Sequence, residues 1–504
     1  MTMANIRNLA DIMGPGRPDD QPFLIEVASD DTETTISYGE ARAKVRAIAR
    51  GLRSQGLERG DTVAILAENS LQYVLAYLGI MWAGLVAVPI NHRLPADTVA
   101  HLLKDCRARL TLVDGERREL AGGAVPMLEL EGRGDGSLDG ICDPGDMDAV
   151  AMEDGEVATI LYTSGSTGLP KGVELRHGGY IWVVQHYEHL RESMEGERVL
   201  VAAPLFHMNA LAFSKVLMWL GGTNVLMRRF TPDGYIRAIG RHRCAAITSV
   251  PTMLALALRE EEELARTDLN CVRQVITGSS PSSEEFFTRI GSAFPNAAIY
   301  NSWGTTEAGP VCFGPHPDGL ARPDVALGYP FADVEVKLVD GPSPEEGVLH
   351  LRTPALMTGY LNRPEETAKR LKDGWYDTGD VMRRDADGFY YFVGRADDML
   401  VCGGENVYPG EVEKLLERHR DVMQAAVVAV ADEIKHQLPV AFVVARPGTR
   451  PSADELRQFA LDNGPAYAHP RAVWLVDELP LAGTNKIDRK TLTEKAGALF
   501  EPRR

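Results

Sequence analysis

The residues best suited to chemistry lie between Tyr162 and Val173, in the stretch YTSGSTGLPKGV. After Tyr162 it contains three glycines, one lysine (Lys171) and four residues with aliphatic hydroxyls, which are Thr163, Ser164, Ser166 and Thr167. Glycines let backbone N–H groups close around oxygen atoms, hydroxyls donate further hydrogen bonds, and a lysine supplies positive charge. The stretch therefore favours binding of a polyphosphate.

This stretch is not a Walker-type phosphate loop, which requires G-x-x-x-x-G-K-[ST]. Counting from Gly165, Pro170 occupies the second glycine position and Gly172 follows the lysine. The apolar run Ala158–Tyr162 directly before it predicts a buried strand. Taken alone, the stretch is also compatible with an ordinary surface loop rich in glycine and serine.

Length, charge and cysteine content limit the possible classes of protein. At 504 residues the chain is long enough for about three domain-sized units. A net charge of −18 argues against nucleic acid or an anionic membrane surface as the main partner. The six cysteines include no C-x-x-C pair, and no secretory signal is visible, so we expect a reduced, cytoplasmic protein.

One uncharged stretch, Asn69–Asn91, is long enough to cross a bilayer at 23 residues. Gly84 and Pro89 divide it into a helix-length piece and a short strand-like piece. A core helix that leads into a buried parallel strand has the same composition. We therefore expect no membrane span.

The elements that must position the loop alternate along the chain. Ser37 and Glu40 form a capping box that starts a helix, and Thr62–Ala67 predicts the next strand. Regular succession of helix and strand predicts a layered α/β fold with largely parallel sheets. The pattern changes to short strands and turns around residues 328–379 and starts afresh near residue 400. Between about residues 114 and 154 we expect an irregular surface connection.

Further motifs follow the loop in a fixed order. They are NSWGTTE from Asn301, YDTGD from Tyr376, GRADDMLVCGGENVYPGEVE from Gly394 and TNKIDRK from Thr484. With these motifs the chain resembles the adenylate-forming superfamily from about Tyr38 to Lys490. This superfamily contains acyl-CoA synthetases, firefly luciferase and the adenylation domains of peptide synthetases.

The resemblance implies a large N-terminal multi-layer α/β domain with a small β-rich part, and a small hinged α+β C-terminal domain. We expect these domains at residues 1–394 and 395–504, with the hinge at Asp397. It also implies a two-step acid–thiol ligase. A carboxylic acid reacts with ATP to give an acyl-adenylate and pyrophosphate, and a thiol then takes the acyl group and releases AMP. The small domain rotates between the two steps.

The resemblance also implies roles for residues at the matching positions. Lys486 is the catalytic lysine between the carboxylate and the α-phosphate, and Glu307 and Thr163 are Mg²⁺ ligands. Asp380 and Arg395 bind the ribose, and Trp303 stacks on adenine. The remaining nucleotide-binding or catalytic residues are Thr163, Ser164, Gly165, Ser166, Thr167, Gly168, Lys171, Ser302, Gly304, Thr305 and Thr306.

For the acid, the matching positions are His207, Met208, Asn209 and Ser279. Further pocket candidates are Val183, His186, Ser249 and Ser302. They include no arginine that would bind a second carboxylate, so we expect a bulky, largely apolar monocarboxylic acid. The thiol of coenzyme A is expected to enter by a tunnel beside Gly403 and Gly404.

Each of these residues also has a purely structural interpretation. Glu307 could end a turn, Asp380 could cap a helix, Lys486 could be a solvated charge, and His207 could be a core residue. Two positions depart from the family pattern. Asn485 precedes the lysine where glycine is usual, and Ser279-Ser280 replaces a pair of small apolar residues.

Coenzyme A is the expected acceptor, and three other functions remain open. A stand-alone adenylating enzyme would load the thiol of a carrier protein instead. A luciferase-like monooxygenase would use the same motifs. An inactive adenylate-binding sensor would be expected to lose Lys486 or Glu307, and the sequence retains both. A homodimer is possible.

Overall fold

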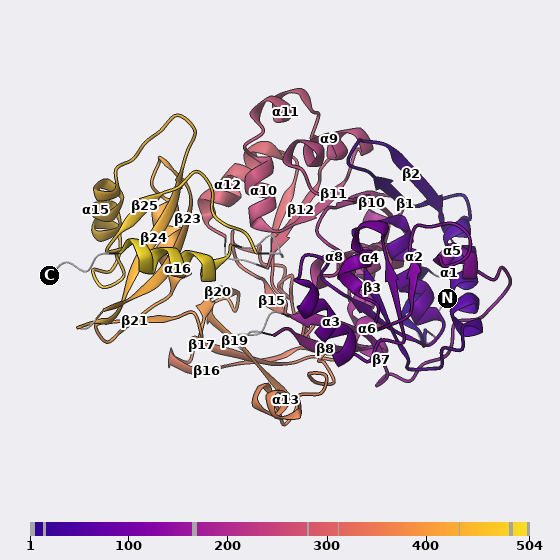
Figure 1. Ribbon diagram of the computed structural model, residues 1–504. Helices are drawn as coiled ribbons and strands as arrows, with labels where there is room; N and C mark the ends of the chain where they lie inside the picture. Colours follow the sequence, from indigo (N-terminus) through magenta and orange to yellow (C-terminus); the bar gives the residue numbers. More distant parts are fainter. Residues whose placement is uncertain are drawn as a thin grey trace.

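The computed structural model describes residues 6–13, 17–163, 169–279, 282–310, 312–432, 434–482 and 487–500. Two large sheets and their helices form the N-terminal part, shown from indigo through magenta to pink in Figure 1. A smaller β-rich part and a C-terminal unit, orange to yellow, follow beside them. The expected α/β fold class is thus confirmed.

The first sheet has the strand order β13-β12-β11-β9-β10-β1-β2. All neighbouring strands are parallel except β1 and β2. Its strands are β1 (Pro22–Val27), β2 (Glu33–Ser37), β9 (Arg198–Val201), β10 (Thr223–Met227), β11 (Ala246–Ser249), β12 (Gln274–Gly278) and β13 (Ala298–Ser302).

The second sheet has the order β6-β5-β3-β4-β7-β8, and only the β7–β8 pair is antiparallel. Its strands are β3 (Thr62–Leu66), β4 (Val86–Pro89), β5 (Leu110–Val113), β6 (Met127–Glu129), β7 (Val157–Thr163) and β8 (Lys171–Arg176). The predicted parallel character is therefore confirmed for both large sheets. Strand β8 was not expected from the sequence.

Helix α2 (Leu71–Trp82) explains the uncharged stretch. It contacts β1 of the first sheet and β3 and β4 of the second, and all its residues except Gln72 are buried. A helix that is apolar all round is buried on every side. Across the described residues, no helix is long and apolar enough to cross a membrane.

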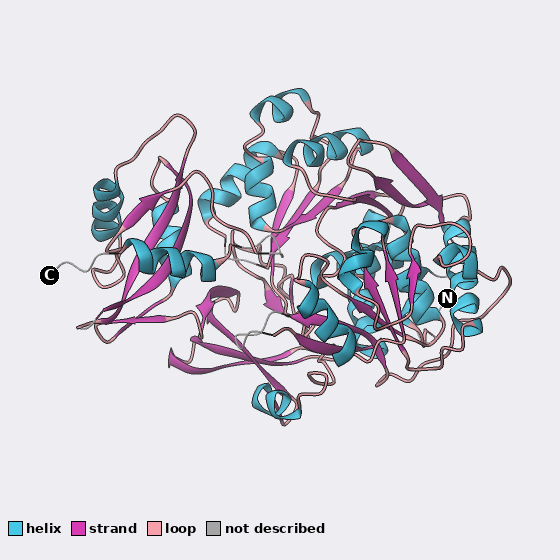
Figure 2. Cartoon of the chain, viewed as in Figure 1, coloured by secondary structure: helices cyan, strands magenta, loops and turns pink. Residues whose placement is uncertain are grey.

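The remaining helices of the N-terminal part pack around the two sheets, as Figure 2 shows in cyan. Helix α1 begins at the predicted capping box, in which Ser37 and Glu40 satisfy each other's backbone N–H groups. The helices are η2 (Leu9–Met13), α1 (Tyr38–Ser54), α3 (Ala96–Asp105), η3 (Gly115–Arg117), α4 (Arg118–Ala121), α5 (Leu138–Ile141), α6 (His177–His186), η4 (Glu188–Leu190), α7 (Arg191–Met194), α8 (Met208–Leu220), α9 (Pro232–His242), α10 (Pro251–Ala257), α11 (Glu261–Arg266) and α12 (Glu284–Ala293).

The β-rich part is an antiparallel sheet of the order β16-β17-β19-β18, with β20 beside β19. Its elements and the preceding short hairpin are β14 (Phe313–Gly314), β15 (Tyr329–Pro330), β16 (Glu335–Ser343), β17 (Glu346–Arg352), α13 (Pro364–Arg370), β18 (Leu371–Lys372), β19 (Trp375–Arg384) and β20 (Tyr390–Arg395). The predicted irregular connection at residues 114–154 is only partly irregular, because it contains η3, α4, β6 and α5.

The C-terminal unit has its own hydrophobic core, which runs from Leu400 to Ala496. Its sheet has the order β22-β21-β24-β23, with β25 beside β24. Its elements are β21 (Leu400–Cys402), β22 (Glu405–Val407), α14 (Pro409–Glu417), β23 (Val422–Asp432), β24 (His436–Ala445), α15 (Ala453–Asn463), β25 (Val473–Leu475) and α16 (Arg489–Leu499). The domain boundary at 394/395 stays a prediction.

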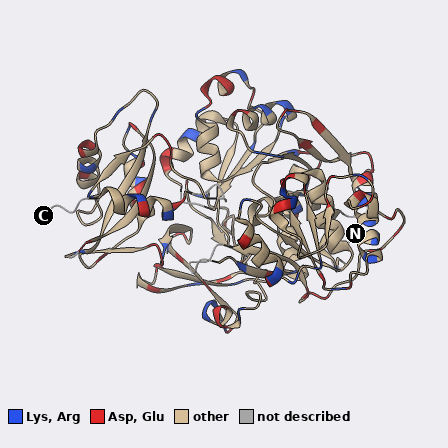
Figure 3. Ribbon diagram, in the orientation of Figure 1, with Lys and Arg blue, Asp and Glu red and all other residues tan. Residues whose placement is uncertain are grey.

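Charged residues are distributed unevenly over this fold. Acidic and basic side chains are mixed on outer helices such as α11, α13 and α15, whereas the strands of the large sheets are mostly uncharged (Figure 3).

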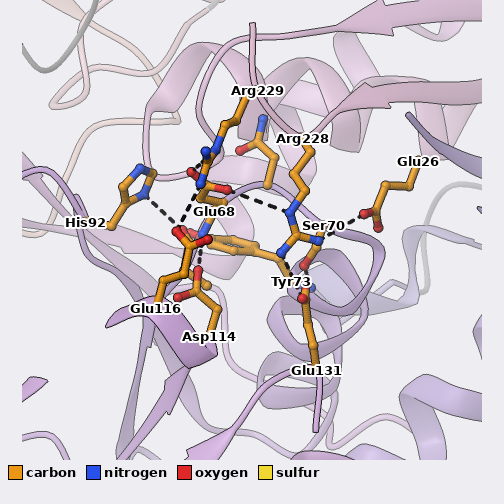
Figure 4. A network of polar contacts seen from close by, with 12 residues as sticks. Glu26, Glu68, Ser70, Tyr73, His92, Asp114, Glu116, Glu131, Arg228 and Arg229 are labelled. Carbon is orange, nitrogen blue, oxygen red and sulfur yellow. Dashed lines mark hydrogen bonds and ion pairs between the residues drawn. The ribbon is translucent and has the colours of Figure 1, made fainter. Parts of the chain in front are cut away.

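An ion-pair network joins the two large sheets where their strands end (Figure 4). At its centre is the buried Glu68, which follows β3. Its carboxylate contacts Arg229 at 2.5 Å and Arg117 at 2.8 Å, and Arg228 lies 3.7 Å away. Arg228 also pairs with Glu26 of β1 at 3.2 Å. Burial alone would raise the pKa of Glu68, but the hydrogen bond from Arg229 and the charge of Arg117 outweigh it and lower that pKa.

Replacing Glu68 with alanine would leave these guanidinium groups without their shared partner. We expect the free energy of unfolding to fall by roughly 2 kcal/mol, less than for a fully buried pair because Arg229 is half exposed. Because the pKa of Glu68 is lowered in the folded state, the stabilisation by its carboxylate is fully present above pH 4.5 and is lost as the pH falls through the folded-state pKa. The melting temperatures of wild type and Glu68→Ala at neutral and acidic pH measure this stabilisation, and the exposed Glu58→Ala is the control. An equal melting temperature for Glu68→Ala and wild type at neutral pH would contradict it.

Candidate active site

A cavity of about 900 Å³ lies at the carboxyl ends of the parallel strands of the first sheet. The segments that follow β9, β11, β12 and β13 contribute His207, Val250, Ser279 and Trp303 to its wall. Ligands of open α/β sheets bind at this edge. Other parts of the wall come from the β7–β8 hairpin, the β-rich part and the C-terminal unit. We therefore take this cavity as the candidate active site.

The predicted phosphate loop falls in the sequence between β7 and β8, which pair as antiparallel strands. Thr163 and Lys171 are paired across this hairpin, and both line the cavity. The Lys171 ammonium lies 2.9 Å from a carboxylate oxygen of Glu366 and 5.5 Å from the ring centroid of Tyr360. The other predicted loop residues lie outside the described part of the chain, and these are Ser164, Gly165, Ser166, Thr167 and Gly168.

Glu307, the predicted Mg²⁺ ligand, lines the cavity in the turn that follows β13. The Tyr360 hydroxyl donates a hydrogen bond of 2.9 Å to its carboxylate. Burial and then the charge of Glu307 raise the pKa of Tyr360, so the phenol stays a neutral donor. A carboxylate has about four lone-pair sites, and one phenol leaves it the capacity to bind a cation. These residues therefore fit a divalent cation such as Mg²⁺.

Asp380, the predicted ribose ligand, lies on β19 opposite Arg395 of β20. Each of its carboxylate oxygens accepts one hydrogen bond, from the Trp303 indole at 2.8 Å and from Arg395 at 2.9 Å. Burial raises the pKa of Asp380 even though Arg395 opposes this shift. Arg395 also pairs with Asp397, the predicted hinge residue, at 2.9 Å.

Trp303 has a role that sequence reasoning missed. Stacking of its ring on adenine stays a prediction, whereas the structure shows its indole N–H donating to the carboxylate of Asp380. Ser302, Gly304, Thr305 and Thr306, the neighbouring predicted residues, line the cavity as well.

Two residues of the wall have strained backbones. Ser279 and Val325 have φ values of +69° and +56°, which non-glycine residues rarely adopt. The side-chain amide of Asn301 donates a hydrogen bond of 2.6 Å to the carbonyl oxygen of Val325. Strain of this kind persists only where the surrounding structure fixes the conformation.

The predicted acyl-binding residues His207, Met208 and Asn209 lie at the start of α8 and line the cavity. The side-chain oxygen of Asn209 accepts a hydrogen bond of 3.1 Å from Thr248. The other pocket candidates, Val183, His186 and Ser249, are not among the residues that line the cavity. They pack elsewhere. Val183 packs with Ala355, His186 packs on Phe331, and Ser249 is fully buried.

The C-terminal unit closes one side of the cavity with Ile487 and Arg489. Lys486, the predicted catalytic lysine, lies outside the described residues, but the next residue, Ile487, lines the cavity. Gly403 and Gly404 instead lie in the exposed turn between β21 and β22 and are not part of this wall.

Sequence reasoning missed several residues of this wall. Tyr360 holds Glu307, Glu413 binds Arg489 at 2.6 Å, and burial raises the pKa of Glu417 to about 7. Glu413 is the last residue of the motif that starts at Gly394, but that motif gave it no role, and no local pattern marked Tyr360 or Glu417. Their functional relevance follows only from the tertiary contacts.

Comparison with known proteins identifies the family. The model of the AMP-binding enzyme family matches residues 15–361, and the model of its C-terminal domain matches residues 411–486. The chain belongs to the AMP-binding enzyme family. It is therefore an enzyme of the AMP-binding ligase class, as the order of its motifs indicated.

Curated relatives of this AMP-binding enzyme extend over almost its whole length. It is 34% identical to a feruloyl-CoA synthase of Amycolatopsis sp. over 92% of its own chain and 94% of that protein. It is 33% identical to the fatty acid–[acyl-carrier-protein] ligase ScoC of Streptomyces coeruleorubidus, over 92% of each chain. Among solved structures, the anthranilate CoA ligase AuaEII in complex with anthranoyl-AMP has a TM-score of 0.87 and 26% identity, and 99% of each chain is covered.

The Glu307→Gln variant of this AMP-binding enzyme tests the cation site. A neutral amide is a poor Mg²⁺ ligand, so we expect acyl-adenylate formation to fall on the order of a hundredfold. Pyrophosphate release at graded Mg²⁺ concentrations measures the loss. Exposed Glu365→Gln is the control and should behave as wild type. Wild-type rates for Glu307→Gln at limiting Mg²⁺ would remove Glu307 from the site.

Proposed function

We propose that this enzyme is an AMP-forming ligase that joins an aryl carboxylic acid to coenzyme A. The observation that supports this most strongly is the shared cavity. Thr163 and Lys171 of the phosphate hairpin, Glu307, the Asp380–Arg395 pair and the start of α8 all face it, as does Ile487 beside Lys486. These are the groups needed to bind a triphosphate, a ribose and an acid next to one another.

In the first step, a carboxylate oxygen of the acid attacks the α-phosphorus of ATP. A new oxygen–phosphorus bond forms, the bond to the β-phosphate oxygen breaks, and pyrophosphate leaves. Two anions must meet, so positive charge has to stand where they react. In this proposal Lys486 bridges the carboxylate and the α-phosphate, and Lys171 binds the leaving phosphates. Glu307 would hold Mg²⁺, which supplies further positive charge to the phosphates.

In the second step, the sulfur of the acceptor attacks the acyl carbonyl carbon. The carbon–oxygen bond to phosphate breaks, AMP leaves, and the thiol proton passes to solvent. Lys486 and the Gly403–Gly404 turn belong to the same C-terminal unit. Since Ile487 lines the cavity and that turn does not, the arrangement fits the first step. Rotation of the C-terminal unit about Asp397 would then bring the Gly403–Gly404 turn to the cavity for the second step.

The proposed class of acid follows from the wall around α8 and from the relatives. Met208, Val250, Met253 and Val325 supply apolar surface, and His207 and Asn209 supply polar atoms. A mixed wall of this kind suits an aryl acid better than a plain alkyl chain. The similar proteins named feruloyl-CoA synthase and anthranilate CoA ligase carry aryl acids in their names.

Two alternatives are weighed by specific observations. The relative named as an acyl-carrier-protein ligase favours a carrier-protein thiol as an alternative acceptor. An inactive adenylate-binding sensor is disfavoured, because Lys171, Glu307 and Asp380 are present and face one cavity. The proposal includes a cytoplasmic location, and a homodimer remains possible.

One experiment tests the proposed function directly. Purified enzyme is given ATP, Mg²⁺ and a panel of aryl and alkyl acids of graded size, with either coenzyme A or a holo-carrier protein. We expect aryl acids to give the CoA thioester with equal amounts of AMP and pyrophosphate, measured by mass spectrometry. Thioester on the carrier alone would favour the alternative acceptor. Release of neither pyrophosphate nor AMP with any acid would contradict the proposal.

A further inference from the structure

Helix α8 contains a single charged residue, Lys215, within the sequence MNALAFSKVLMWL. Its side chain is completely buried, with a relative exposure of 1%. Burying an ammonium group costs several kcal/mol unless other groups compensate for the lost water. A methionine or leucine would fill the same space without that cost. The position of Lys215 therefore requires an explanation.

The surroundings of Lys215 compensate for its charge only in part. Its ammonium donates a hydrogen bond of 3.2 Å to the Tyr77 hydroxyl and lies 4.0 Å from the ring centroid of Tyr180. Among the described residues, burial is the one influence on its pKa, and no charged partner contributes. Burial accordingly lowers the pKa of Lys215 to about 7. The ammonium has three N–H donors. The Tyr77 hydroxyl uses one of them, and the faces of the Tyr77 and Tyr180 rings are weak acceptors. Lys215 can therefore still bind a stronger hydrogen-bond acceptor.

Two hydroxyls, one on Tyr180 and one on the helix that carries Tyr77, are also incompletely satisfied. The Tyr180 hydroxyl lies 2.6 Å from the sulfur of Met208, which is a weak hydrogen-bond acceptor. The Tyr73 hydroxyl, one turn of α2 before Tyr77, is buried with no hydrogen-bond partner in the described structure. Unsatisfied buried polar groups are rare and indicate a missing partner, such as a ligand or a water molecule.

Met208 links this cluster to the cavity. Met208 lines the cavity at the start of α8, and Tyr180 contacts both Met208 and Lys215. Lys215 follows Met208 by seven residues, which is two helical turns on the same face. Side chains on a helix lean toward its N-terminus, so the long Lys215 side chain extends back toward Met208. Methionine has three rotatable bonds and can turn aside at little cost.

We propose that Lys215 and Tyr180 form the far end of the acyl pocket and determine specificity there. They would bind an anionic or strongly accepting group at the end of the acid remote from the reacting carboxylate, once the Met208 side chain turns aside. This inference rests on the proposed function, and it changes the acid expected from the sequence. The preferred substrate is an aryl acid with a polar far end rather than a wholly apolar one.

Three aryl acids of similar shape test the inference. They are cinnamic acids with a para-carboxylate, a para-nitro or a para-isopropyl group, which are of comparable size. The quantity measured is the ratio of kcat/KM for the carboxylate or nitro acid to that for the isopropyl acid. A charge-assisted hydrogen bond is worth enough to change such a ratio about tenfold or more.

We expect Lys215→Met to lower this ratio by about tenfold or more, and Tyr180→Phe to lower it by a smaller factor. Lys337→Met is the matched control, because Lys337 lies 4.1 Å from the ring centroid of Trp375 in the β-rich part, outside the cavity wall. That control should keep the wild-type ratio. Removal of an unpaired buried charge should also leave Lys215→Met at least as heat-stable as wild type.

The possible failures are distinguishable. If Lys215→Met and Tyr180→Phe are folded and keep the wild-type ratio, Lys215 is a core residue and the inference is wrong. It is also wrong if wild type activates the isopropyl acid and rejects both polar acids. If Lys215→Met does not fold, Tyr180→Phe is the test. A lowered kcat/KM ratio in that variant supports the inference, and a wild-type ratio contradicts it. If no aryl acid releases pyrophosphate with any of the proteins, the proposed function itself fails.

Discussion

The arrangement of the candidate site depends on the cations that face its cavity. A carboxylate and a triphosphate can react only where their charges are offset. Lys171, Arg395 and Arg489 each already have a carboxylate partner, namely Glu366, Asp380 and Glu413. These ion pairs hold the cations in place before a substrate binds. They also require residues from the hairpin, the β-rich part and the C-terminal unit to meet at one place.

The fold meets this requirement by combining two kinds of connection. Parallel strands of the first sheet end at one edge and deliver His207, Ser279 and Trp303 to it. Antiparallel pairs then add residues with a fixed register, such as Asp380 opposite Arg395. The uncharged helix α2 packs against strands of both large sheets. A rigid support of this kind keeps the groups that face the cavity at fixed distances.

Much of the fold and the family could be predicted from the sequence, because these features depend on short, local sequence patterns. Hydrophobic runs predicted the buried strands, Ser37 and Glu40 predicted the start of α1, and the ordered motifs predicted the family. Contacts between distant segments could not be predicted. The Trp303–Asp380 hydrogen bond joins residues 77 positions apart, and Tyr360 reaches Glu307 across 53. Lys215 was overlooked because a lone lysine in a helix is usually solvated, and only tertiary packing shows that this one is buried.

The central claim is that one cavity carries out two half-reactions with different parts of the C-terminal unit. Measuring the two half-reactions separately tests it most directly. We expect Lys486→Ala to lose acyl-adenylate formation from acid and ATP but still to convert supplied acyl-adenylate and coenzyme A into thioester. Asp397→Pro, which fixes φ near −65° at the hinge, should still form acyl-adenylate but hardly release thioester. Asp397→Ala is the control for the lost contact with Arg395. Equal loss of both half-reactions in Lys486→Ala and Asp397→Pro, with folding intact, would contradict the account.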